Sequence, residues 1–401
     1  MDPASATARL LLATRGLRAV ADGFVSILLP AYLLALGLDA FQVGVVATAT
    51  MLGSAALTLA VGFGAARHDG RTLLLAAAGL MALTGLGFAW LQGFWPLLLV
   101  AFVGTLNPSS GDVSLFLPLE QAMLTSAVPE ARRTAMFARY ALTGSLLAAA
   151  GTLLAVLPDL AARHLGTPPL RALSAMFLLY AAIGLAAGLL YRRLPRLAVP
   201  DRRVAALGPS RRRVYHLAAL FCLDSFAGGL VVQSLLALFL LQRFDLSLAA
   251  TARLLFWAGL LTALSQLLAP VLARRIGLVR TMVLTHLPAN ACLIAVALVP
   301  ELWQAVTLLL VRAALSQMDV PARASFVMAV VTPPERPAAA SLTAVPRSLA
   351  AALSPMLAGW LLGAGGFGWP LVLAGGLKIT YDLLLLRAFD RVRPPEEADR
   401  S

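Results

Sequence analysis

The sequence predicts an all-α membrane protein with twelve transmembrane helices, arranged as two pseudosymmetric six-helix bundles. Composition is the first observation behind this prediction: of 401 residues, 60% are hydrophobic and 13% are charged, and the mean hydropathy is +0.85. Such a chain has too little polar surface to coat a soluble globule of its size. Twelve long apolar runs and an internal repeat are the other two observations.

Each apolar run is long enough to form a membrane-spanning helix, which needs roughly twenty residues to cross a hydrocarbon core of ~30 Å. Hydrocarbon leaves backbone groups no partner except those within helices or closed barrels, and these runs lack the alternation of barrel strands. The predicted spans cover about 15–37, 41–65, 72–91, 95–122, 135–157, 171–191, 214–241, 248–272, 278–299, 302–331, 339–364 and 368–389.

The second half of the chain repeats the first after a little over 200 residues, with acidic, basic and glycine residues recurring in the same order. The matching pairs are Asp22 and Asp224 at a spacing of 202, Asp112 and Asp319 at 207, and both Arg139 with Arg347 and Gly151 with Gly359 at 208. A duplicated, strongly apolar chain is typical of secondary transporters, in which two helical bundles rock about a site between them.

A basic segment, 192–213, divides the two halves, because it holds three prolines and many arginines without an uninterrupted apolar run. We therefore expect a first six-helix bundle at 1–191, a basic cytoplasmic linker at 192–213 and a second bundle at 214–401. The formal charge of +13 comes from arginines that are concentrated in alternate loops, not gathered on one folded surface. This distribution argues against nucleic acid as a partner and places both termini in the cytoplasm.

Six plus six spans around a basic linker resemble the major facilitator superfamily over essentially the whole chain. The loop between the second and third spans, "FGAARHDGRT", matches the superfamily's conformational loop at Gly70 and Arg71, and the related loop "PVLARRIGLVRT" matches it at Arg275 and Gly277. The poorly characterised bacterial members are the ones that it resembles most. The resemblance implies a monomer in the bacterial cytoplasmic (inner) membrane, whose first, fourth, seventh and tenth spans line the central pathway.

Ionisable residues inside the spans are the main candidates for function, since charges facing lipid are costly and normally face a cavity or each other. The candidates for substrate binding or coupling include Asp22, Asp112, Asp224 and Asp319, and the candidates for gate pairing are Arg139 and Arg347. One interpretation makes them ion pairs that form and break as the cytoplasmic gate opens. The other makes at least one aspartate a coupling carboxylate that binds a proton when the cavity closes.

Arg312 is a further candidate because its first-half counterpart, at a spacing of 207, is Thr105. A guanidinium near the middle of the membrane is suited to a bidentate grip on a carboxylate or phosphate. The alternative is a structural pair with Asp319, Asp112 or Asp224. Weaker cavity candidates are polar or aromatic residues in neighbouring spans: Ser26, Asn107, Gln233, Trp257 and Gln266. The stretch "NPSSGD" from Asn107 to Asp112 predicts an interrupted helix, since Pro108 removes a helical hydrogen bond.

Motifs for other chemistry do not occur in the sequence. There is no phosphate-binding loop for ATP, no histidine or cysteine spacing typical of a metal site and no hydrolytic constellation, so we expect neither an enzyme nor a cofactor. The sequence predicts a proton-coupled secondary transporter, whose partners are a small-molecule substrate and the lipid bilayer. We expect it to export a drug or metabolite as an antiporter. Uptake of a small organic anion is the alternative, followed by a non-transporting receptor on the same scaffold.

Overall fold

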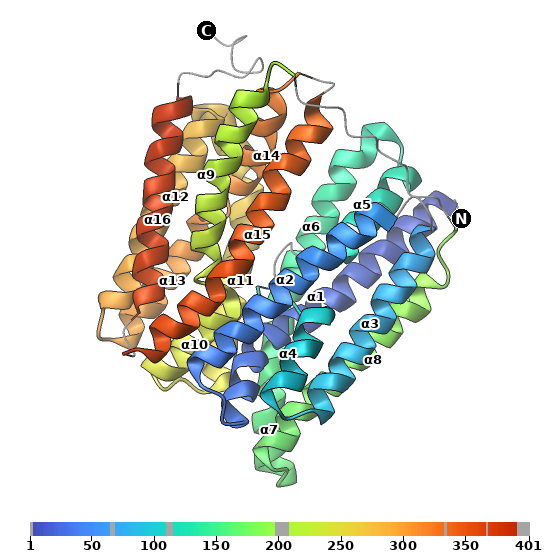
Figure 1. The fold of residues 1–401 in the computed structure, drawn as a ribbon, viewed down its shortest axis with the longest axis vertical. Coiled ribbons are helices and arrows are strands. Elements are labelled where there is room, and N and C mark those ends of the chain that lie inside the picture. Colours follow the sequence, from blue (N-terminus) through green and yellow to red (C-terminus); the bar gives the residue numbers. More distant parts are fainter. Residues whose placement is uncertain are drawn as a thin grey trace. The chain divides into compact units, whose positions relative to one another are not determined.

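The computed structural model of the chain describes residues 3–64, 69–109, 115–196, 208–332, 335–365 and 368–390. Over these ranges the regular elements are all helical (Figure 1). Eleven helical segments among them are long and apolar enough to cross a membrane, and the short apolar helix Phe94–Val103 falls in the predicted span 95–122. The predicted fold class is therefore confirmed, and the protein is a multi-pass integral membrane protein.

The helices fall into two compact units. The first unit, 1–202 with 232–256, holds α1 (Pro3–Ala35), α2 (Ala40–Gly64), α3 (Gly70–Trp90), α4 (Phe94–Val103), α5 (Phe116–Ala127), α6 (Glu130–Thr152), the 3-10 helix η2 (Leu153–Val156), α7 (Leu157–Leu165), α8 (Pro169–Tyr191) and α10 (Gln233–Arg243). The second unit, 203–231 with 257–401, holds α9 (Arg211–Gly229), α12 (Leu278–Leu298), α13 (Leu302–Leu315), α14 (Asp319–Ala329), α15 (Arg336–Gly363) and α16 (Trp369–Phe389). Helix α11 (Leu248–Ile276) begins in the first unit and ends in the second.

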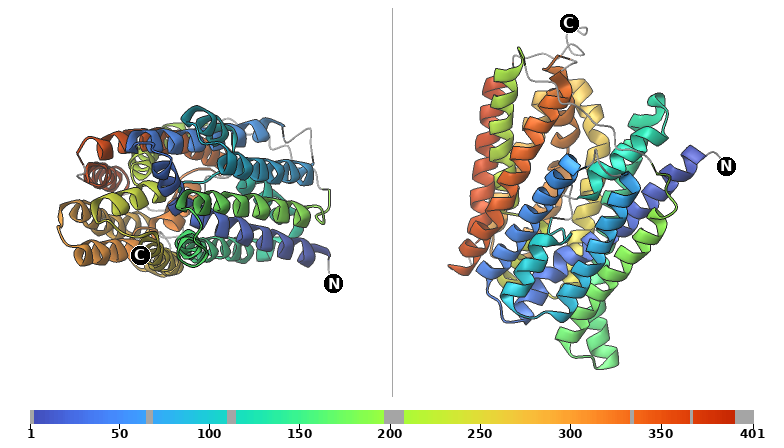
Figure 2. Two further views of the ribbon diagram at one scale, coloured as in Figure 1. Left: turned by 90° about the horizontal axis from the view of Figure 1, so that it is seen from below. Right: turned by 45° about the vertical axis from the view of Figure 1, so that its right-hand side comes forward.

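Corresponding helices pair in the same way within each unit. In the first unit α1 packs along α6 and α3 along α8, and in the second unit α9 packs along α15 and α12 along α16, as Figures 1 and 2 show. Glycine makes the α1–α6 contact close: a Cβ built on Gly23 would lie 2.1 Å from the Ala148 carbonyl oxygen, and one on Gly151 2.3 Å from that of Val20. The repeat in the sequence is thus a repeat of helix pairs.

Three of the predicted spans are each two helices: 95–122 is α4 and α5, 214–241 is α9 and α10, and 302–331 is α13 and α14. The first interruption begins after Val103 and includes Asn107, whose side-chain Oδ1 accepts hydrogen bonds from Ser109 N at 3.1 Å and Ser109 Oγ at 2.7 Å. The Pro108 carbonyl accepts a hydrogen bond of 3.0 Å from Ser234 N at the start of α10. Backbone groups freed where one span is interrupted thus pair with backbone groups freed where another span is interrupted.

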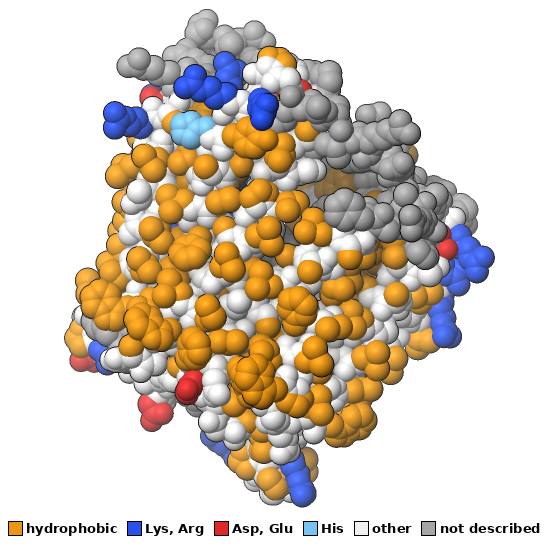
Figure 3. Space-filling model, viewed as in Figure 1, with side chains coloured by type: hydrophobic (Ala, Val, Ile, Leu, Met, Phe, Trp, Pro, Cys, Tyr) orange, Lys and Arg blue, Asp and Glu red, His pale blue; other side chains and the backbone are white. Residues whose placement is uncertain are grey.

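Helix α1 begins at Pro3, twelve residues before the predicted start of its span, and its 33 residues extend over about 50 Å. Arg15 and Arg18, which lie inside the predicted span 15–37 as well, are both buried. Hydrophobic side chains are spread over the face shown in Figure 3, with few charged side chains among them, as expected for helices in contact with lipid.

Candidate functional site

Glu120 on α5 is the centre of a buried polar cluster in the first unit, with 0% of its surface exposed. Its carboxylate pairs with the Arg18 guanidinium of α1 and accepts hydrogen bonds from three hydroxyl groups. These come from Thr14 at 2.9 Å, Tyr191 at 2.5 Å and Tyr140. The Arg18 guanidinium also lies 4.0 Å from the centroid of the Phe116 ring. Four helices thus converge on one carboxylate, which the sequence analysis did not select, although its position inside the predicted span 95–122 was a usable signal.

Asp22 lies one turn after Arg18 on α1, and only 8% of its surface is exposed. No cation in the described part of the chain forms an ion pair with it. Arg18 and Arg15 are the cations that attract it from further away. Ser26, predicted to line the cavity beside Asp22, donates 2.7 Å to the Gly23 carbonyl within the helix. Asp112 lies outside the described residues.

Asp224 on α9, the counterpart of Asp22, has two cations. Lys378 Nζ of α16 lies 2.6 Å from its Oδ1, and Arg323 Nη1 of α14 lies 2.8 Å from its Oδ2. The Arg323 Nη2 also lies 3.4 Å from Asp319 Oδ2, one turn earlier on α14. Asp224 and Asp319, both predicted site residues, are therefore joined through Arg323. Neither Arg323 nor Lys378 was selected from sequence, although a lone lysine inside the predicted span 368–389 was a visible signal.

A second buried carboxylate, Asp382, lies one turn from Lys378 on α16. His286 Nδ1 of α12 lies 2.9 Å from its Oδ1, and Asn290 Nδ2 donates 3.1 Å to its Oδ2. All three side chains are buried. The second unit thus has two groups of paired polar side chains, on α9, α14 and α16 and on α12 and α16. Among the described residues of the first unit, Glu120 has an ion pair and Asp22 has none.

Arg312 is a half-buried residue on α13 whose Nε is enclosed and has no hydrogen-bond partner. It forms no ion pair with Asp319 or Asp224, since Arg323 occupies both. Of the two predicted gate arginines, Arg139 is exposed on α6 and Arg347 is half-buried on α15. The two arginines belong to different units.

The weaker cavity candidates are spread over the helices. Asn107 is buried at the interruption after α4, and Gln233 is half-buried at the start of α10. On α11, Trp257 is exposed and Gln266 is half-buried. The structure therefore does not gather these four residues around one point of a single unit.

The predicted conformational loops lie at helix starts. Gly70 and Arg71 open α3 after Asp69, whose carboxylate accepts 2.9 Å from Thr72 N and 2.8 Å from Thr72 Oγ1. These hydrogen bonds lower the pKa of the Asp69 carboxyl. Arg275 is exposed at the end of α11, and Gly277 alone separates α11 from α12. Its φ of 90° lies in the region that favours glycine, which explains the residue type at this joint.

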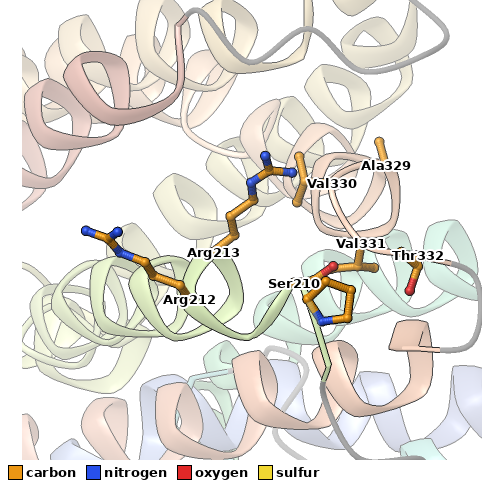
Figure 4. Close-up of a pocket in the computed structure, with 8 residues that line it drawn as sticks. Ser210, Arg212, Arg213, Ala329, Val330, Val331 and Thr332 are labelled. Atoms are coloured by element: carbon orange, nitrogen blue, oxygen red, sulfur yellow. The ribbon is translucent and has the colours of Figure 1, made fainter.

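A pocket of ≈ 530 Å³ opens between the start of α9 and the end of α14 (Figure 4). Arg212 and Arg213 belong to its lining, and their guanidinium groups point in different directions in Figure 4. The Glu335 side chain accepts hydrogen bonds from backbone N–H groups just before α9. Its Oε1 accepts one from Gly208 N at 2.5 Å and one from Ser210 N at 3.3 Å. Its Oε2 accepts 2.5 Å from Thr332 Oγ1. Hydrogen bonds from Thr332 and Ser210 lower the pKa of Glu335 to about 2.

Metal binding has no support among the residues that the structure describes, where no group of three His, Cys, Asp or Glu side chains could hold an ion.

Broken helices, repeated helix pairs and buried charges are the features that a family assignment has to explain. A family model described as Major Facilitator Superfamily matches residues 11–318. The chain belongs to this superfamily. Its members are transporters, which makes this protein a secondary transporter with a small-molecule substrate, and not an enzyme.

Relatives of this superfamily protein match it from end to end. The uncharacterized membrane protein YJR124C of Saccharomyces cerevisiae is 23% identical over 96% of this chain and 94% of its own length. A bacterial homologue of the human lysosomal transporter Spinster, solved inward-facing and unoccupied, has a TM-score of 0.75 at 15% identity over 98% of this chain and 99% of its own. The human organic anion transporter MFSD10 has a TM-score of 0.66 at 18% identity over 96% and 100%. At these identities the solved structures show the fold alone.

Proposed function

We propose that this superfamily transporter couples the movement of a small organic solute to a proton, and that Asp22 is the residue that carries the proton. The observation behind the proposal is the contrast between two repeated positions. Asp224 has Lys378 and Arg323 within ion-pair distance, whereas Asp22 is buried without an ion-pair partner in the described residues. A buried carboxylate needs either a counter-charge or a proton, so Asp22 is the one that can change its charge during a transport cycle.

Reconstituted liposomes with an internal pH dye test this proposal. Pools of metabolites and antimicrobials are screened for solute-dependent proton movement, and the solute found is then measured with Asp22→Asn. We expect the variant to lose proton movement while it still binds the solute. Asp245→Asn, at an exposed carboxylate between α10 and α11, is the matched control. A wild-type pH dependence of flux in Asp22→Asn would remove Asp22 from the coupling role.

The direction of transport is part of the same proposal. An exporter of a drug or metabolite exchanges its solute for a proton, so the two compete for the site. A carrier that takes up an organic anion binds both together. Solute accumulation in liposomes is measured at imposed pH gradients of either sign. Only the organic-anion carrier should accumulate solute on the side that receives protons.

The organic-anion carrier is favoured by Arg312. Its Nε is enclosed without a hydrogen-bond partner, as expected of a guanidinium whose partner is a ligand. The human transporter MFSD10, which shares the fold, is described as an organic anion transporter. We expect Arg312→Ala to abolish transport of an anionic solute without changing folding or insertion. Full flux in that variant would exclude Arg312 from the site.

A further inference from the structure

Arg15 on α1 is a buried cation that the mechanism above does not use. Only 7% of its surface is exposed, and its guanidinium carbon lies 5.3 Å from the centroid of the Tyr140 ring on α6. Gly144, one turn further along α6, makes room for it: a Cβ there would lie 2.4 Å from Arg15 Nε. That Nε is enclosed and has no hydrogen-bond partner.

The arginine also has no ion pair in the described part of the chain. Two other buried cations each have an ion pair, since Arg18 pairs with Glu120 and Lys378 pairs with Asp224. A buried arginine without an ion pair depends on more distant acids for charge compensation, and Asp22 is such an acid for Arg15.

Charge balance ties this arginine to Asp22. Arg15, Arg18 and Asp22 lie on one face of α1, at positions separated by three and four residues. With Glu120 they make two positive and two negative groups, so the cluster is neutral when Asp22 is ionised. When Asp22 carries a proton, the cluster has one uncompensated positive charge.

The helices packed against α1 supply few other ionisable groups near Asp22. Helices α2 and η2 carry none in their sequences, and α10 carries only Arg243 at its last residue. The groups that α5, α6 and α8 direct at the cluster are Glu120, Tyr140, Tyr180 and Tyr191. Since Glu120 already pairs with Arg18, Asp22 is the acid whose protonation changes the charge that Arg15 experiences.

We propose that Arg15 binds the carboxylate of a small monoanionic solute, and that it does so when Asp22 is protonated. The inference rests on the proposed function, in which Asp22 carries the coupling proton. One uncompensated positive charge matches a monocarboxylate better than a phosphate monoester, which carries about −1.5 to −2 at neutral pH. The guanidinium fork supplies two parallel donors to the two oxygens of a carboxylate. Proton and anion then bind together, as in a symporter.

Equilibrium binding tests the site without transport. Purified protein in detergent is titrated with acetate, lactate, benzoate and octanoate, with benzamide as the neutral counterpart of benzoate, and thermal stability is followed at about pH 5.5 and about pH 8, where carboxylates stay ionised. We expect at least one carboxylate to stabilise the protein more strongly at the lower pH. Asp22→Asn should bind it on the order of tenfold more tightly than wild type at the higher pH, and with no pH dependence, because a charge about 10 Å along the helix is removed.

Two variants address Arg15 itself. Arg15→Gln should lose the stabilisation by the carboxylate, and Gly144→Ala should weaken it by displacing the guanidinium. The matched controls are Arg171→Gln, at an exposed arginine of α8, and Gly79→Ala, where a Cβ meets nothing within 4 Å. No stabilisation by any of the four carboxylates in folded wild-type protein would overturn the proposal, as would an unchanged response in Arg15→Gln.

The outcomes separate this inference from the proposed function. If Asp22→Asn keeps a wild-type pH dependence of flux while carboxylate binding still requires Arg15, the coupling role of Asp22 is wrong and the anion site remains, without its proton linkage. If Asp22→Asn loses coupling and Arg15→Gln binds carboxylates normally, the coupling role remains and the anion site is wrong.

Discussion

Lys378 and Arg323 hold opposite oxygens of the same carboxylate: Lys378 Nζ lies 2.6 Å from Asp224 Oδ1, and Arg323 Nη1 lies 2.8 Å from Oδ2. Lys378 is the single lysine of the chain, and it comes from the last helix. The pairing joins α9, α14 and α16 through one buried side chain.

Removing one cation should destabilise this junction. We expect Lys378→Met to lower the free energy of unfolding by roughly 3 kcal/mol, since breaking a buried pair leaves an uncompensated charge. Denaturation of the purified protein in detergent micelles measures this. The double variant Lys378→Met with Asp224→Asn should recover much of the loss, because it removes the acid as well. A single variant as stable as wild type would contradict the pairing.

Hydrogen bonds to Glu120 can be removed one at a time with almost no change in volume. Tyr140→Phe and Tyr191→Phe should each destabilise the protein by about 1.5–3 kcal/mol, the range for hydrogen bonds to charged groups. Because both act on one carboxylate, the double variant should deviate from the sum of the two single variants. Tyr215→Phe, at an exposed tyrosine of α9, is the control and should leave stability unchanged.

Close packing of α1 on α6 predicts sensitivity at Gly23. A Cβ there would lie 2.1 Å from the Ala148 carbonyl, so Gly23→Ala must separate the two helices, at a cost of about 1–3 kcal/mol. Gly79→Ala on α3 should be neutral, because a Cβ at Gly79 meets nothing within 4 Å. Thermal unfolding followed by tryptophan fluorescence compares the two. Equal midpoints would show that the helices are not in backbone contact.

Glu335 should make stability depend on pH in acid. Its pKa of about 2 in the folded protein lies below the ordinary value of 4.5, so its contribution is complete above about pH 4.5 and is lost as the pH falls toward 2. We expect the thermal midpoint of wild type to fall more steeply than that of Glu335→Gln between pH 5 and pH 3. Asp245→Asn should follow wild type. Parallel curves for wild type and Glu335→Gln would contradict the hydrogen bonds at the start of α9.

The helices could be predicted from sequence because the length and apolarity of a run are local properties, set by the thickness of a bilayer. The start of α1 was predicted twelve residues late because an arginine such as Arg15 is typical of the cytoplasmic end of a span. Arg18 lies one turn further into the predicted span. Both arginines are buried in the structure, and for Arg18 the reason is Glu120, 102 residues later in the chain. A partner at that distance leaves no local signal.

Repetition in the sequence likewise predicted equivalent roles for Asp22 and Asp224. Their surroundings differ because Arg323, at a spacing of 207, corresponds to Phe116 and not to a basic residue. The cation of the first unit is instead Arg18, which stacks on Phe116. The two halves thus share the same helix pairs but not the same positions of charged side chains. Only the side-chain geometry distinguishes the two aspartates.

Lys378 is on α16, the last helix to be synthesised, and this position has a consequence for membrane insertion. Spans enter the bilayer in the order of synthesis, and α9 exposes Asp224 there before any cation of α14 or α16 has been made. Intramembrane acids raise the cost of inserting a span by about 2.5–3.5 kcal/mol on translocon scales. Helix α9 is therefore expected to remain near the insertion machinery until the later helices arrive, and a ribosome stalled before α16 should leave a nascent chain that quality-control proteases recognise.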